Sequence, residues 1–133
     1  MKSIFTLGFI LAIGYTGLAQ HQLDIKITGL ESSEGFVMVD LVDEKGQSIK
    51  GYKLEIEDRI AQLQIKELKK GTYGIRYFHD ENANEEMDTV LFGIPKEGYG
   101  FSNNARGNMG PPKLEDYLFS VEGDLSMTLR TVN

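Results

Sequence analysis

The chain has 133 residues, of which 41% are hydrophobic and 26% are charged, and this length suits one domain. Its net charge of -6 argues against a nucleic-acid binder, because such a protein needs basic surface for phosphates. The chain has no cysteine, which excludes disulfide scaffolds, thiol catalysis and cysteine-based zinc sites.

Residues 1–19 have the pattern of a secretory signal peptide. A positive start at Lys2 precedes an uncharged stretch with an apolar centre, and the small residues Gly17 and Ala19 predict cleavage before Gln20. The alternative is an uncleaved anchor helix, but glycines dilute the stretch below the roughly 18 strongly apolar residues that an anchor needs.

Cleavage would leave a single domain, residues 20–133. Since no cysteine follows the cleavage point, we do not expect a lipid anchor. We expect export to the periplasm or the extracellular space, with no membrane span after cleavage. A domain of this size without disulfides would depend on core packing, to which a bound ion could add.

Four strands are predicted in the first half of this domain. Apolar and polar residues alternate at 23–28 and again at 60–65, with the period of two that is typical of a half-buried strand. The run at 36–42 is richer in apolar residues, which favours a central strand. A weaker strand is expected at 49–56.

Three further strands are predicted at 73–78, 117–121 and 125–130, the last two joined by a hairpin turn at 122–124. No segment carries a sustained helical period. We therefore predict an all-β fold, an antiparallel immunoglobulin-like or transthyretin-like β-sandwich of about seven strands with one long structured loop.

The long loop runs from Phe78 to Lys113, well beyond the 12–15 residues that are usual in compact domains. It contains all three prolines and several glycines, which fix unusual backbone angles. Aromatic residues such as Tyr99 and Phe101 can pack it onto the sandwich. The composition therefore favours a structured loop over a disordered one.

The start of this loop places oxygen-bearing side chains at alternate positions, as calcium-binding loops do. Asp80, Asn82, Asn84 and Asp88 stand at relative positions one, three, five and nine, and position seven would supply the backbone carbonyl of Glu86. Calcium takes six to eight oxygen ligands. The spacing predicts a calcium site formed by these five residues, with calcium as the cofactor.

The match to an EF-hand is partial. Position six, normally glycine, is Glu85, and position twelve, normally glutamate, is Leu91. Water or a distant carboxylate such as Glu97 could complete a shorter site. The alternative is an Asx-rich turn whose side chains cap their own backbone without a metal, and the sequence leaves both interpretations open.

Three linked blocks of this chain are similar to a known pattern: His79–Asn82 continuing to Asp88, Phe92–Asn104, and Gly110–Pro112. They resemble the signature of a bacterial family of exported proteins catalogued as domain of unknown function 2141, and the likeness extends over nearly all of the predicted domain. The family usually has glycines inside the acidic loop, where this chain has Ala83 and Glu85. The resemblance implies a small exported β-sandwich, of the transthyretin or carboxypeptidase-regulatory type, with no established activity.

Catalysis is not expected. A hydrolytic triad would need His79 with a nucleophile such as Ser102, and no Gly-x-Ser-x-Gly pattern surrounds this serine. Carboxylate pairs for glycoside cleavage can be drawn, but acidic residues are so frequent that such pairs carry little weight. A hydrolase is kept only as an outlier.

Two non-enzymatic functions remain. The first, which we take as the leading prediction, is an envelope interaction module that presents the long loop to a protein partner. The second is a module that binds carbohydrate or another small ligand. Its predicted surface consists of Tyr99, Phe101, Asn103, Asn104 and Arg106. Loop packing and turn formation are the alternative roles for these five residues. The expected partner is an unknown envelope protein or a glycan.

Overall fold

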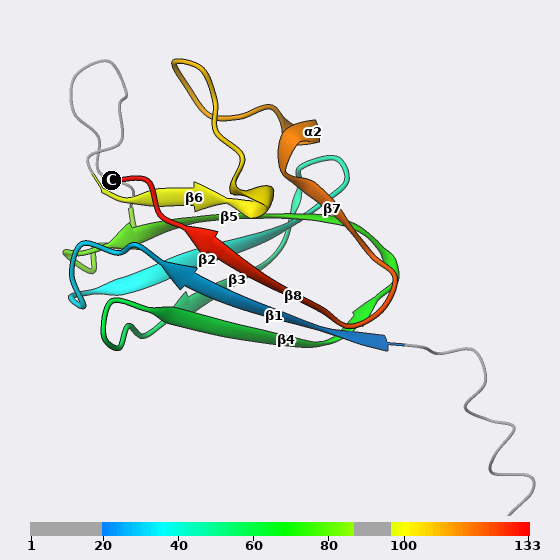
Figure 1. Ribbon diagram of the computed structural model, residues 1–133, viewed down its shortest axis with the longest axis horizontal. Helices are drawn as coiled ribbons and strands as arrows, with labels where there is room; N and C mark the ends of the chain where they lie inside the picture. Colours follow the sequence, from blue (N-terminus) through cyan, green and yellow to red (C-terminus); the bar gives the residue numbers. More distant parts are fainter. Residues whose placement is uncertain (1–19, 87–96) are drawn as a thin grey trace, which may run out of the picture.

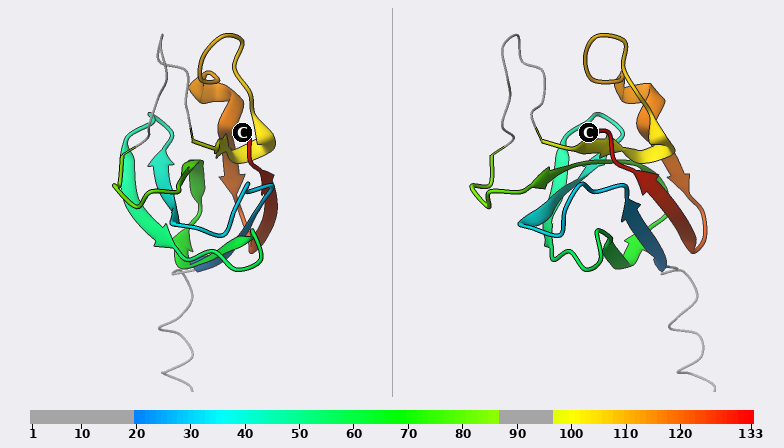
Figure 2. Two further views of the ribbon diagram at one scale, coloured as in Figure 1. Left: turned by 90° about the vertical axis from the view of Figure 1, so that its left-hand side faces the viewer. Right: turned by 60° about the vertical axis from the view of Figure 1, so that its left-hand side comes forward.

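The computed structural model describes residues 20–86 and 97–133. The predicted signal peptide and Asp88 lie outside these ranges. The described chain forms two facing β-sheets, one of three strands and one of five (Figures 1 and 2). The predicted all-β sandwich is confirmed, with eight strands in the described ranges.

The small sheet has the strand order β4-β1-β8. Its strands are β1 (Gln20–Thr28), β4 (Ala61–Lys69) and β8 (Leu125–Arg130). Strand β1 pairs antiparallel with β4 and parallel with β8. The sheet is therefore mixed, whereas the sequence led us to expect antiparallel pairing throughout.

The large sheet is built around β5 (Gly71–Asp80). Its other strands are β2 (Phe36–Asp43), β3 (Ser48–Leu54), β6 (Tyr99–Phe101) and β7 (Leu118–Val121). One edge of β5 pairs with β2, which in turn pairs with β3. The other edge pairs with β7 along its first half and with β6 along its second half. The predicted central position of β2 is confirmed, since it has a neighbour on each side.

The predicted hairpin between β7 and β8 is wrong. Strand β7 pairs with β5 in the large sheet, and β8 pairs with β1 in the small sheet, so the turn at 122–124 joins the two layers. The side-chain carboxylate of Asp124 accepts a hydrogen bond of 2.9 Å from the backbone N–H of Gln22, which fastens this turn to β1. Turn residues signal a reversal of the chain but do not specify which sheet the next strand joins.

The core lies between the sheets and consists of the side chains that alternate inward from both. Leu23, Ile27, Val37, Ile75 and Leu129 are among its fully buried members. Burying each such side chain contributes about 1.5–3 kcal/mol. The period of two seen in the sequence therefore reports this buried face.

The segment predicted as one long loop contains regular structure. Strand β5 continues to Asp80, and β6 is followed by the 3₁₀-helix η2 (Ser102–Asn104) and the short helix α2 (Leu114–Tyr117). Reciprocal backbone hydrogen bonds of 3.0 and 2.8 Å join Tyr99 of β6 to Val132. Within the described ranges, no helix has the length and apolar character needed to cross a membrane.

Candidate functional site

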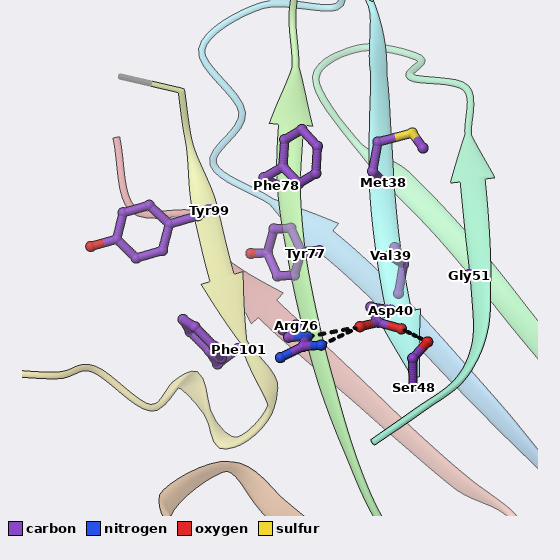
Figure 3. Close-up of a pocket in the computed structure, with 10 residues that line it drawn as sticks. All are labelled: Met38, Val39, Asp40, Ser48, Gly51, Arg76, Tyr77, Phe78, Tyr99 and Phe101. Carbon is purple, nitrogen blue, oxygen red and sulfur yellow. Dashed lines mark hydrogen bonds and ion pairs between the residues drawn. The ribbon is translucent and has the colours of Figure 1, made fainter. Parts of the chain in front are cut away.

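The outer face of the large sheet carries a hollow of about 420 Å³ (Figure 3). Strand register places two rows of side chains across it. In one row Met38, Phe78 and Tyr99 occupy paired positions on β2, β5 and β6. We call the surface formed by both rows the aromatic face; its members are Met38, Asp40, Arg76, Phe78, Tyr99 and Phe101.

The second row contains an ion pair. Asp40, Arg76 and Phe101 occupy paired positions on the same three strands. The Nε and a terminal nitrogen of Arg76 lie 2.8 and 2.7 Å from one oxygen of Asp40, and the hydroxyl of Ser48 donates to the other oxygen (Figure 3). The arginine side chain is 45% exposed and the aspartate 27%. At this exposure the pair adds at most about 1 kcal/mol to stability.

Gly100 allows β6 to carry two outward aromatic rings. It lies between Tyr99 and Phe101, so a side chain here would point inward, and its Cβ would lie 2.3 Å from the hydroxyl oxygen of Tyr77. The phenol of Tyr77 thus fills the space beneath β6, where its hydroxyl lies 3.2 Å from that of Thr131. Burial raises the pKa of Tyr77 to about 12.

The rings of β6 are packed against further aromatic groups. The Tyr99 and Phe101 rings meet edge to face with centroids 6.3 Å apart. The Phe101 ring also packs against Tyr117 of α2, with centroids 5.0 Å apart and a tilt of 50°. Contacts of this kind favour one orientation of each ring.

Ser102 is fully buried and binds backbone groups. Its hydroxyl accepts a hydrogen bond of 3.0 Å from the N–H of Ile75 and donates to the carbonyl of Tyr117. The imidazole of His79 is also fully buried, with Nε2 at 2.7 Å from the carbonyl oxygen of Glu34. Its Nδ1 is buried and has no hydrogen-bond partner among the described residues.

Asn103 and Asn104, predicted as ligand-binding residues, clamp the backbone. The amide of Asn103 donates to the carbonyl of Leu118 at 2.8 Å, and the side-chain oxygen of Asn104 accepts the N–H of Arg130 at 2.8 Å. Both residues have positive φ, at 60° and 51°, a conformation that asparagine tolerates well. These bonds tie η2 to β7 and β8, so the two amides support the site from below.

The five predicted surface residues therefore fall into three groups. Tyr99 and Phe101 line the hollow, while Asn103 and Asn104 hold the backbone. Arg106 is exposed and lies outside the residues that line the hollow.

Sequence reasoning missed Met38, Asp40, Arg76 and Phe78. The usable signal was the apolar character of β2 on both of its faces. A two-layer sandwich covers one face of each sheet, so an apolar residue such as Met38, out of phase with Val37 and Val39, must face outward.

The acidic loop begins at Asp80, whose side chain is fully buried. One carboxylate oxygen accepts the backbone N–H of Asn84 at 3.2 Å, and the other accepts that of Glu85 at 2.7 Å. A carboxylate placed in this way satisfies the amides of the turn that follows it. Asp80 therefore organises the start of the loop.

The next two oxygen-bearing side chains act in the same manner. The side-chain oxygen of Asn82 accepts the N–H of Asn84 at 3.3 Å, and that of Asn84 accepts the N–H of Glu86 at 2.9 Å. An Asx turn joins a side chain to the amide two residues later, which accounts for the alternate spacing. Ala83 is the middle residue of the first turn and Glu85 that of the second, and their φ angles are 56° and 63°. Glycine adopts this left-handed conformation most easily, which agrees with the glycines that the family usually has inside this loop.

Glu97, which could complete a calcium site, is buried and accepts the N–H of Glu81 at 2.9 Å. The residues that the structure describes contain no group of three or more histidine or acidic side chains placed to hold a metal ion. Their geometry matches the Asx-turn interpretation. Because Asp88 lies outside the described ranges, calcium binding stays a prediction.

The sequence model of a protein family, described as an uncharacterized protein conserved in bacteria (DUF2141), matches residues 25–128 of this chain. The matched range begins in β1 and ends in β8, and it includes all six members of the aromatic face. The resemblance noted from the sequence is confirmed. Searches of curated proteins and of solved structures found no match.

Proposed function

The chain belongs to the bacterial family DUF2141, and from the chemistry of its surface we propose that it is a non-catalytic binding domain of the cell envelope. Recognition would take place on the aromatic face. The observation that carries this proposal is the open hollow among Phe78, Tyr99 and Phe101, on a sheet face that does not contribute to the core. Concave surfaces lined by aromatic residues with a few polar groups are typical of binding sites.

Several features support a binding role over a catalytic one. The two groups considered for a hydrolytic triad, His79 and Ser102, are fully buried. On the aromatic face, the charges of Asp40 and Arg76 neutralise each other. General acid–base chemistry needs a group that can reach the substrate and exchange a proton.

The envelope location rests on the signal-peptide pattern of residues 1–19. The mutual packing of Tyr99, Phe101 and Tyr117 suits a surface formed before binding. Such preorganisation reduces the entropy lost on association.

Chemical-shift mapping tests the proposal. The ¹⁵N-labelled protein is titrated separately with the protein fraction and the glycan fraction of a bacterial envelope. We expect shifts clustered on β2, β5 and β6, abolished by Tyr99→Ser and retained in Gln64→Ala on the small sheet. Shifts confined to the small sheet, or none with either fraction, would contradict the proposal.

A further inference from the structure

We propose that the aromatic face binds an uncharged saccharide, with a pyranose ring stacked among Phe78, Tyr99 and Phe101 and its hydroxyl groups hydrogen-bonded to Asp40 and Arg76. This inference rests on the proposed binding function and names the class of ligand.

The arrangement of the rings provides the stacking part. Phe78 and Tyr99 are paired across β5 and β6, and Phe101 follows on the same face of β6 (Figure 3). A pyranose presents flat patches of C–H groups, and an aromatic ring presents a negatively polarised face to them. Met38 closes the same row on β2 with a flexible apolar side chain.

The ion pair distinguishes a sugar from a purely apolar partner. Asp40 and Arg76 lie in the lining of the hollow and are partly exposed to water. An apolar side chain placed over them would remove that water without replacing its hydrogen bonds, which is costly. Hydroxyl groups can replace it, because each can donate to the carboxylate and accept from the guanidinium.

The same pair disfavours a charged ligand. An anion attracted to Arg76 would be repelled by Asp40, whose oxygen lies 2.7 Å from the guanidinium nitrogen. A cation attracted to Asp40 would in the same way be repelled by Arg76. The neutralised pair therefore selects a polar ligand without net charge.

Space in the hollow supports a short saccharide. Its volume of about 420 Å³ lies in the lower part of the range of small-ligand pockets. Gly51 is paired with Asp40 on β3 and lines the hollow without a side chain. A Cβ at this position would come no closer than 3.7 Å to its nearest neighbour, the carbonyl oxygen of Val39. The backbone therefore accepts a Cβ at this position, and Gly51→Leu is chosen as the variant that places a side chain in the hollow.

Titration calorimetry with the exported protein tests the inference. The probes are neutral hexose and N-acetylhexosamine oligomers, with uronic acid oligomers as the charged comparison. We expect saturable binding of a neutral oligomer and weaker binding of the charged ones. Tyr99→Ala and Gly51→Leu should each reduce the affinity at least tenfold, whereas Gln64→Ala on the small sheet should leave it unchanged. Circular dichroism and melting curves of each variant show that it is folded.

The outcomes separate this inference from the proposed function. If no oligosaccharide binds, but envelope proteins shift the amides of β2, β5 and β6, the saccharide is wrong and the binding face stands. If only charged oligomers bind, or if Gly51→Leu binds as tightly as the parent, the inference is overturned. If a saccharide binds to the small sheet instead, both proposals fall.

Discussion

The two outer faces of this sandwich have opposite chemistry, although both sheets bury the same kind of side chains between them. On the small sheet, register places Ser126, Asp24 and Gln64 in one row, all polar. On the large sheet, the corresponding surface carries aromatic rings around an ion pair. The inner faces determine the fold, so outer faces can vary. A polar outer face is the ordinary solvated surface, and the departure from it on the large sheet is the reason why we propose that recognition takes place there.

The largest expected loss of stability comes from filling the space beneath β6, where Gly100 lies against the Tyr77 phenol. Gly100→Ala places a methyl group against the Tyr77 phenol and should destabilise the domain by about 2–3 kcal/mol, because overpacking displaces a buried ring. Urea denaturation measures this loss. Gly123→Ala, where a Cβ meets nothing within 4 Å, is the control and should change stability by less than about 0.5 kcal/mol. Equal effects of the two substitutions would show that β6 does not depend on this close approach.

The predicted calcium site lies at the end of β5, where the acidic loop leaves the large sheet, and it can be tested through its effect on stability. If calcium binds the native protein, a concentration of about a hundred times its dissociation constant adds roughly 2.7 kcal/mol to stability. Melting curves with calcium and with a chelator measure the difference, with magnesium as the control. We expect Asp88→Ala to abolish any gain. Identical melting in all three conditions would leave the Asx turns as the complete account of this loop.

The inner face of β5 should respond to alkaline pH. Burial raises the pKa of Tyr77 to about 12 from the usual value of 10. The folded state favours the neutral phenol, whereas the unfolded chain ionises it from about pH 10. The free energy of unfolding should therefore be unaffected by Tyr77 below pH 10 and should fall by about 2–3 kcal/mol as the pH rises toward 12. Stability measured from pH 9 to 12 should fall less steeply for Tyr77→Phe than for the parent. Parallel curves would contradict this assignment.

The difference between the two outer faces can be removed by replacing aromatic side chains of the large sheet with polar ones. Phe78→Thr combined with Tyr99→Thr should cost only about 1 kcal/mol, since both side chains are partly exposed and threonine suits a strand. Binding to the aromatic face should nevertheless disappear. A loss of several kcal/mol in urea denaturation would mean that these rings serve the fold instead.

The smallest effect is expected in the acidic loop. Ala83 has a left-handed backbone, so Ala83→Gly should stabilise the protein by about 0.5–1 kcal/mol as the strain is relieved. Glu85→Gly should act similarly. Thermal melting without added metal measures the gain. A lower melting temperature for both variants would show that the left-handed turns are not strained.

The sequence was sufficient to predict the layers but not their connections. The strands at 23–28 and 125–130 follow from the alternation of apolar side chains, because each buries one face. Their parallel pairing did not follow, since it depends on the chain crossing between sheets at 122–124. Short-range turn signals contain no information about that choice.

The site was only partly predictable for a related reason. Tyr99 and Phe101 stood out because they lie in a glycine-rich segment with little strand character. Asn103 looked equally available, yet its amide binds a carbonyl fifteen residues further along the chain. Arg76 and Asp40 are separated by 36 residues, and only strand pairing brings them together.

The bridge between Tyr99 and Val132 ties the segment after β8 to the strand that carries the two rings. Strand β6 pairs with β5 on one side and, at Tyr99, with Val132 on the other, so the segment after β8 helps to hold the Tyr99 backbone in place. Truncation before Val132 would therefore remove two backbone hydrogen bonds from Tyr99, while β6 keeps its pairing with β5 and the Phe101 ring keeps its contact with Tyr117.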